Sequence, residues 1–129
     1  MTKEELVEAA REARRGAYAP YSGFSVGAAL LTTDGRVFTG CNVENVSFGL
    51  TLCAERVAVG SALAAGVMQF ETIAIVSDST EPVMPCGACR QVMAEFNSDL
   101  RIVSATTGGE LIELTLGFLL PNARQGILG

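Results

Sequence analysis

The spacing of hydrophobic positions along the chain predicts four helices. In residues 3–15 apolar side chains recur at helical spacing, with acidic residues early and arginines late, which suits the helix dipole. Residues 53–65 carry a face of small side chains at the same spacing, and Gly66 fits a C-terminal cap. The remaining helices are expected over residues 86–96 and, as a short final element, residues 115–120.

Extended apolar runs between these helices predict five strands. Two of them, residues 24–31 and 36–43, flank Asp34-Gly35, which is a strong hairpin signal. The other three cover residues 72–76, 100–104 and 111–114, and a turn at residues 107–110 makes the last two antiparallel. Strands that alternate with helices in this order indicate an α/β fold around a layered sheet, which is mixed because hairpins interrupt the parallel crossovers.

Length and composition predict one domain that associates with copies of itself. The chain has 129 residues, enough to bury a core, and it contains no repeats or linkers, so residues 1–129 are expected to form a single domain. Hydrophobic residues make up 49% of the chain and charged residues only 18%. A small domain this apolar often covers part of its surface by homo-oligomerisation.

The charge balance argues against a nucleic-acid-binding protein. Fourteen acidic residues against nine basic ones leave a net charge of −5, and no stripe of lysine and arginine is present to neutralise phosphates. A small, weakly charged substrate fits better. The N-terminus lacks the pattern of a signal peptide, and no apolar stretch approaches the length that spans a membrane. Cysteines in such a chain read as reduced thiols or metal ligands, so a cytoplasmic location is expected.

The chemistry of the chain is concentrated in two short cysteine phrases. The chain has four cysteines and no histidine; Cys53 stands in Thr51-Leu-Cys-Ala-Glu55, and Cys86 and Cys89 stand in Pro85-Cys-Gly-Ala-Cys-Arg-Gln91. Three thiolates can hold a zinc ion and leave its fourth position free for water. Glu55, two residues after the first thiolate, can then handle the protons of that water. The pairing of such a glutamate with Pro-Cys-x-x-Cys is the signature of zinc deaminases.

The local charge at such a site also leads to a prediction about an arginine. Both cysteine phrases fall where a loop becomes a helix, and exposed N–H groups there favour thiolates. Three thiolates and a dication still leave a net charge of about −1, so nearby cations are needed to keep the zinc a useful Lewis acid. Arg56 directly follows the first phrase, and Arg90 directly follows Cys89 in the second. We expect Arg56 to hydrogen-bond one or two of the thiolates.

Other interpretations of the cysteines remain open at this point. Cys41 could complete a structural four-thiolate site, although its strand-like surroundings suit a small buried thiol. Cys86 and Cys89 alone could form a redox dithiol, which would leave Cys53 and Glu55 without a role. Glu55 could be an ordinary solvated acid in the first turn of a helix.

The chain resembles the cytidine deaminases of the short, all-cysteine type over nearly its whole length. The similar segments are Tyr18-Ala-Pro-Tyr-Ser22, Phe24-Ser-Val-Gly-Ala-Ala-Leu30, Gly40-Cys-Asn-Val-Glu-Asn45, Cys53-Ala-Glu-Arg56, Pro85-Cys-Gly-Ala-Cys-Arg-Gln91 and Leu119-Leu-Pro121. The resemblance implies a three-layer α/β/α sandwich around a mixed five-stranded sheet, and a homotetramer with active sites at subunit contacts. It also implies hydrolysis of cytidine and deoxycytidine to uridine and deoxyuridine with release of ammonia, as in pyrimidine salvage.

The resemblance also implies a role for each matching residue. The implied zinc ligands are Cys53, Cys86 and Cys89, and the implied proton shuttle is Glu55. Asn42 and Glu44 would bind the ribose hydroxyls, Phe24 would pack beside the nucleoside, and the backbone of Ala54 would contact the base. Arg56 would offset the negative charge of the thiolates. Three positions depart from the family pattern. Phe48 stands where tyrosine is common, Gly60 where a bulky apolar residue is common, and Arg124 where an aromatic often reaches a neighbouring subunit's base.

The hypothesis that follows is zinc-dependent deamination with Glu55 as proton shuttle. Zinc lowers the pKa of its bound water so that hydroxide forms near neutral pH, and Glu55 relays the proton to the pyrimidine. One alternative is a zinc deaminase that acts on another aminopyrimidine, such as an antibiotic of the blasticidin type. Those relatives typically lack the Asn-x-Glu-Asn phrase present at residues 42–45. The other alternative is a non-catalytic scaffold in which zinc has no open position.

Overall fold

A mixed five-stranded sheet with the strand order β2-β1-β3-β4-β5 forms the centre of the computed structural model, which describes residues 1–126. The strands are β1 (Val26–Thr32), β2 (Val37–Cys41), β3 (Phe70–Ser77), β4 (Arg101–Thr106) and β5 (Leu111–Thr115). β1 pairs antiparallel with β2 and with β3, β3 and β4 run parallel, and β4 and β5 are antiparallel. The expected mixed sheet and its antiparallel final pair are therefore confirmed.

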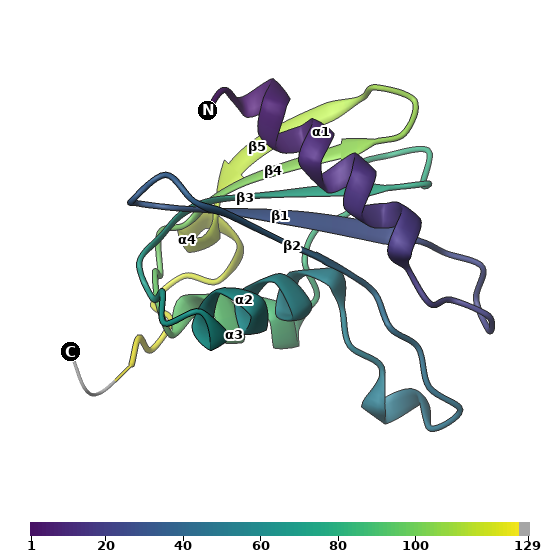
Figure 1. Ribbon diagram of the computed structural model, residues 1–129. Helices are drawn as coiled ribbons and strands as arrows, with labels where there is room; N and C mark the ends of the chain where they lie inside the picture. Colours follow the sequence, from purple (N-terminus) through teal and green to yellow (C-terminus); the bar gives the residue numbers. More distant parts are fainter. Residues whose placement is uncertain (127–129) are drawn as a thin grey trace.

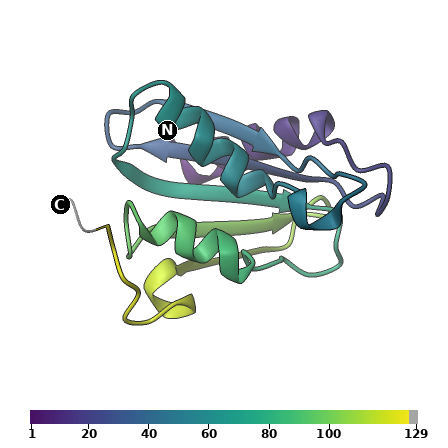
Figure 2. The ribbon, with the colours of Figure 1, turned by 90° about the horizontal axis from the view of Figure 1, so that it is seen from below.

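The helices cover both faces of this sheet. α1 (Lys3–Ala13) lies on one face, and α2 (Ala54–Ala64) and α3 (Gly87–Ala94) lie on the other (Figure 1). Figure 2, seen from below, shows α2 and α3 side by side along the sheet. Short elements complete the chain: 3-10 turns at Arg14–Gly16 and Phe48–Leu50, and α4 (Leu116–Leu119). The three-layer α/β/α sandwich is confirmed, and no helix within residues 1–126 combines the length and apolar character needed to cross a membrane.

The central strands are buried on both faces because side chains alternate along a strand. Ala28 and Leu30 of β1 belong to the core beneath α2 and α3, whereas Ala29 between them packs with Leu6 and Ala10 on the side of α1. β3 and β4 follow the same alternation. This explains why these strands read as continuous apolar runs in the sequence.

Element boundaries differ from the predicted ones at a few ends, and each difference has a local cause. The first strand begins at Val26 rather than at Phe24, because the Asn42 side chain accepts from Val26 N at 2.9 Å and donates to Phe24 O at 2.8 Å in place of a strand partner. The second helix starts one residue later than expected, because Cys53 is its N-cap. The first helix ends at Ala13, where the chain tightens into a 3-10 turn.

Gly40 allows β2 to lie directly against α2, the helix that follows Cys53. A Cβ atom at this position would lie 2.5 Å from Ala58 N and 2.6 Å from Ala54 O, both rigid backbone atoms. Substitution of Gly40 by Ala should therefore lower the free energy of unfolding by about 1–3 kcal/mol, the usual cost of overpacking. Urea unfolding measures this difference.

Gly60 provides the matched control for Gly40 because it lies in α2, the helix that Gly40 contacts, and has open space around it. Here Gly60→Ala should raise the free energy of unfolding by roughly 0.5–1 kcal/mol, because alanine loses less backbone entropy in a helix. If the two alanine variants had the same stability, the close approach of β2 and α2 would be refuted.

Candidate functional site

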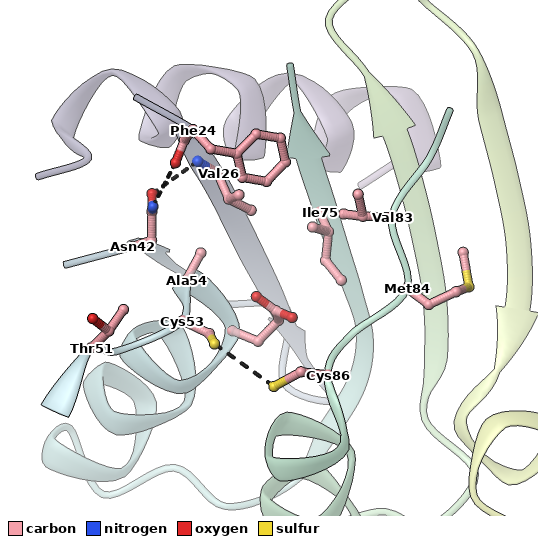
Figure 3. A pocket seen from close by; sticks show the side chains of 11 residues that line it. Phe24, Val26, Asn42, Thr51, Cys53, Ala54, Ile75, Val83, Met84 and Cys86 are labelled. Carbon is pink, nitrogen blue, oxygen red and sulfur yellow. Dashed lines mark hydrogen bonds between the residues drawn. The ribbon is translucent and has the colours of Figure 1, made fainter. Parts of the chain in front are cut away.

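Three cysteine side chains meet where α2 and α3 begin. Cys53 is the N-cap of α2, Cys86 is the N-cap of α3, and Cys89 lies in the first turn of α3. The Sγ atoms of Cys53 and Cys86 are 3.8 Å apart (Figure 3), and all three sulfurs lie within 4.8 Å of one another. Both cysteine phrases thus open a helix, as the sequence predicts, and the packing of α2 beside α3 brings the phrases together.

The spacing of these sulfurs fits a tetrahedral zinc site. Zinc binds thiolate sulfur at about 2.3 Å, so two ligands on one tetrahedron are separated by roughly 3.8 Å. The distance of 3.8 Å between the Sγ atoms of Cys53 and Cys86 equals this edge. Three protein ligands leave one tetrahedral position for a water molecule, which is the arrangement of catalytic rather than structural zinc sites.

Cys41 lies apart from this cluster. It is the last residue of β2, and its Sγ atom is 3.5 Å from the place that a Cβ atom on Gly16 would occupy, next to the end of α1. The residue before it, Gly40, faces α2, so Cys41 points to the opposite face of the sheet. The four-thiolate alternative is therefore wrong for the described residues, where the metal-binding group comprises Cys53, Cys86 and Cys89.

Arg56 contacts the cluster in the way the sequence predicts. Its Nη2 donates to Cys53 Sγ at 3.5 Å and to Thr51 O at 3.3 Å. The hydrogen bond from Cys89, followed by those from Arg56 and Cys86, lowers the pKa of Cys53 to about 5. The hydrogen bond to Cys53 and burial raise the pKa of Cys89. Of these two thiols, Cys53 carries negative charge more readily, and Arg56 is its counter-cation.

Arg90, the other arginine that follows a ligand phrase, has a different set of partners. Its Nε donates to Pro85 O at 2.7 Å and its Nη1 donates to Leu119 O at 3.1 Å. The guanidinium group is therefore engaged with two backbone carbonyls. The sequence made Arg90 a candidate for offsetting the charge of the thiolates, but the structure shows no hydrogen bond between Arg90 and a cysteine of the cluster.

Glu55 lies in the wall of the same cavity as Cys53 and Cys86. Only 6% of its surface is exposed, so it is not the solvated first-turn acid of the simplest interpretation. Burial raises the pKa of its carboxyl group, and the negative charge at Cys53 acts in the same direction. A carboxyl group with a raised pKa beside a metal site is suited to accept and return a proton near neutral pH.

The cavity beside the cluster has a volume of about 240 Å³. Phe24 and Ala54, two predicted substrate-binding residues, are in its wall with Asn42 (Figure 3). Five further lining residues carry no role in the sequence analysis: Val26, Thr51, Ile75, Val83 and Met84. Thr51 could have been found from its place in the first cysteine phrase. The other four are apolar and have the same pattern as core residues, so no sequence signal separates them.

Asn42 and Glu44, the predicted ribose-binding pair, line neighbouring hollows rather than one. Asn42 belongs to the cavity beside the cysteines, whereas Glu44 lines a second hollow of about 340 Å³ with Tyr21, Ser22, Phe48 and Thr51. Thr51 lines both, so the two hollows adjoin. The Asn42 amide also holds the start of β1, which leaves one N–H and one lone pair for other partners.

Glu44 is anchored by the loop that carries Tyr21 and Ser22. Its Oε1 accepts from Tyr21 N at 3.0 Å and from Ser22 N at 3.1 Å, and its Oε2 accepts from the Ser22 hydroxyl. The Ser22 hydroxyl, helped by these two N–H groups, holds the pKa of Glu44 below its ordinary value of 4.5. The carboxylate therefore stays ionised in mildly acidic solution.

This lowered pKa predicts a pH-dependent stability difference between the wild type and Glu44→Gln. A carboxyl group with a depressed folded-state pKa stabilises the fold above its unfolded pKa, and the contribution is lost as pH falls through the folded pKa. The wild type should be more stable at pH 6–7, and the difference should shrink below about pH 4.5. Thermal unfolding of both proteins at each pH measures it. A difference that stayed constant from pH 7 to pH 3 would contradict the anchoring role.

Comparison with known proteins agrees with this geometry. The family model described as the cytidine and deoxycytidylate deaminase zinc-binding region matches residues 1–106. A cytidine deaminase of Halalkalibacterium halodurans is 49% identical over 95% of this chain and 94% of that protein. The crystal structure of cytidine deaminase from Burkholderia pseudomallei superposes with a TM-score of 0.93 at 54% identity, covering 96% of this chain and 100% of that one.

This chain is also similar to a deaminase that is named after an antibiotic. The blasticidin-S deaminase of Bacillus cereus is 34% identical over 91% of this chain and 88% of that protein, which is a weaker match than those to the cytidine deaminases. The sulfur cluster, the buried acid and these similarities agree: the chain belongs to the cytidine deaminase family and is a zinc-dependent enzyme.

Proposed function

We propose that this enzyme hydrolyses cytidine and deoxycytidine to uridine and deoxyuridine with release of ammonia. The observation that carries the proposal is the presence of three sulfurs at zinc-site spacing and the buried acid Glu55 around one cavity. The sequence identity of about half of the residues to cytidine deaminases, over nearly the whole chain, supports a cytidine nucleoside as the substrate.

Cys53, Cys86 and Cys89 would hold the zinc ion, which when bound lowers the pKa of a water molecule so that it becomes a nucleophile near neutral pH. Glu55 accepts a proton from this water and passes it to ring nitrogen 3 of the pyrimidine, which makes carbon 4 electrophilic. The oxygen of this water would bond to carbon 4, and Glu55 would carry its remaining proton to the amino group. The bond between carbon 4 and the amino nitrogen would then break, so that ammonia leaves and the carbonyl of the uracil ring forms. The burial of Glu55 keeps competing water away from these transfers.

Arg56 would keep the sulfur-rich site from becoming too electron-rich. Three thiolates and a dication have a net charge of about −1, and the guanidinium contact to Cys53 offsets part of it. The backbone N–H groups at the starts of α2 and α3 act in the same direction.

The nucleoside would lie with its base against Phe24 and the backbone of Ala54, and with its sugar toward Asn42 and Glu44. Phe24 is 36% exposed at the cavity wall, so its ring is available to a ligand. The Glu44 carboxylate, ionised and held in place by its loop, can accept from a ribose hydroxyl in the adjoining hollow. Asn42 can supply its remaining N–H to the same sugar.

Charge around the cavities favours a free nucleoside over a nucleotide or a polynucleotide. Within the described residues, the two hollows are lined by the acids Glu55 and Glu44 and by Cys53 and Cys86, and no lysine or arginine is among their lining residues. Arg56, the nearby cation, is engaged with Cys53. A phosphate group would meet negative charge here without a free cation, and the chain as a whole carries −5.

A comparison of substrates tests the proposal directly. Ammonia release should be efficient with cytidine and deoxycytidine, and at least about 100-fold slower with cytidine 5′-monophosphate and with blasticidin S, as expected when a polar substrate group meets an unmatched site. Faster turnover of blasticidin S would favour the antibiotic-type alternative, which the weaker similarity to a blasticidin-S deaminase keeps as the second candidate. Faster turnover of the monophosphate would contradict the charge argument.

We further propose that the enzyme is a cytoplasmic homotetramer with active sites at subunit contacts. Large exposed apolar side chains support this assembly: Tyr21 and Phe48 line the second hollow, and Val46, Leu50 and Leu52 lie on the segment between Glu44 and Cys53. Exposed apolar side chains beside a site support a contact with another chain. Light scattering should give the mass of four chains, and a monomer at micromolar concentration would contradict the assembly.

Residues 1–129 would form a single deaminase domain. The single five-stranded sheet of the described residues, covered by helices on both faces, supports this proposal.

Arg124 would lie where it can influence substrate preference through this assembly. Its side chain is exposed, and its carbonyl accepts from Gln91 Nε2 at 3.2 Å, which holds the segment against α3. In place of an aromatic ring the enzyme would present a flexible cation there, which can also stack on a base.

A further inference from the structure

Of the three cysteines, Cys86 is the one least held by packing. Cys89 is fully buried in the core and Cys53 is half-buried, whereas Cys86 is exposed. It also follows residues 78–85, a segment without helix or strand. The direction of its side chain therefore depends on how the chain that enters α3 is fixed.

Arg90 fixes the peptide bond that leads directly into Cys86. Its Nε donates to Pro85 O at 2.7 Å, and this carbonyl belongs to the same planar peptide unit as the Cys86 nitrogen. Ser104 of β4 holds the neighbouring carbonyl of Val83 at 2.6 Å. The approach to Cys86 is thus held from the sheet at Val83, three residues earlier, and from α3 at Pro85, immediately before the cysteine.

The same guanidinium group reaches the C-terminal part of the chain. Nη1 donates to Leu119 O at 3.1 Å, a carbonyl at the end of α4. The planar fork of arginine can serve two carbonyls at once in a fixed relative geometry, and hydrogen bonds from a charged donor are stronger than neutral ones. One side chain therefore joins the entry to a cysteine of the cluster to a segment about thirty residues further along the chain.

We propose that Arg90 is a positioning residue for the metal site, which aligns the Cys86 thiolate by holding the Pro85 carbonyl and couples this alignment to the end of α4. The inference rests on the assignment of Cys86 as a zinc ligand under Proposed function. Arg90 does not touch substrate or metal; it acts through the peptide bond between Pro85 and Cys86.

Zinc affinity and the absorption spectrum of the cobalt-substituted enzyme test this role. In Arg90→Gln we expect about 10- to 100-fold weaker zinc binding in competition with a chromophoric chelator, the usual effect of losing a group that orients a metal ligand. The thiolate-to-cobalt absorption band should shift. Arg90→Lys, which retains the charge but has no planar fork, should show a smaller change in the same direction.

Gln91→Ala is the matched control, because it removes the neighbouring hydrogen bond to the C-terminal segment at Arg124 O and leaves Pro85 untouched. Its zinc affinity should equal that of the wild type. If Gln91→Ala weakened zinc as much as Arg90→Gln, the effect would come from the segment and not from Pro85. Unchanged zinc affinity and cobalt spectra in both Arg90 variants would overturn the inference, even if their melting temperatures fell.

Cys86→Ser separates this inference from the function on which it rests. The serine variant should lose tight zinc binding. If it did so while both Arg90 variants bound zinc normally, only the positioning role would fail. If the serine variant kept wild-type zinc affinity, the ligand assignment would fail and the positioning role with it.

Discussion

Glu55→Gln should reduce kcat for cytidine by about 10²- to 10⁴-fold, the range that general acid–base catalysis contributes. Glutamine keeps the size and most hydrogen bonds of the side chain but cannot carry a proton from water to the base. The residue is buried in the cavity wall beside Cys53, so the loss falls on the chemical step. Steady-state kinetics with cytidine measures it.

Zinc content distinguishes this result from a damaged site. The Glu55→Gln protein should still hold one zinc ion per chain, because Glu55 is not among the three cysteine ligands. Glu8→Gln, an exposed change on α1, is the matched control and should keep wild-type kcat. A Glu55→Gln enzyme with near-normal turnover would remove the proton-shuttle role.

The second large effect is expected from Cys89→Ser. Serine is a poor zinc ligand, and Cys89 is fully buried in the first turn of α3. The variant should lose its zinc, and kcat/KM should fall by at least about 10³-fold, which corresponds to the several kcal/mol that a metal supplies to such a reaction. Metal analysis and kinetics on the same preparation measure both.

Cys41→Ser is the control for this substitution, since Cys41 lies on the opposite side of the sheet and outside the cluster. It should keep both zinc and activity. Loss of zinc from Cys41→Ser comparable to that from Cys89→Ser would show that the fourth thiol takes part in the site after all.

Much of the metal site could be predicted from sequence because its geometry is local. Cys86 and Cys89 are three residues apart at the start of a helix, so their shared face follows from helical spacing alone. The contact of Arg56 with Cys53 is equally local, spanning three residues of α2. The glutamate was identifiable because it stands beside a ligand, although its burial becomes visible only in the folded chain.

The substrate cavity was harder to predict because its walls come from distant segments. Ile75 and Val83 have the same apolar pattern as core residues, and only the path of β3 and the following loop brings them to the cysteines. The resemblance implies that Asn42 and Glu44 hold the hydroxyls of one ribose. Because β2 ends at Cys41, the chain beyond it is no longer regular, and the two side chains enter adjoining hollows.

The fold was predictable in its elements and in most of their order. Hairpin signals at residues 34–35 and 107–110 correctly placed the two antiparallel end pairs of the sheet. The partners of Arg90 were not predictable, because Leu119 reaches α3 only through the tertiary course of the C-terminal segment.

X-ray absorption at the zinc edge of the purified enzyme tests the central claim most directly. The spacing of the Cys53, Cys86 and Cys89 sulfurs predicts three sulfur neighbours at about 2.3 Å and one oxygen neighbour from solvent. Four sulfur neighbours, or a fully active enzyme that contains no zinc, would contradict it.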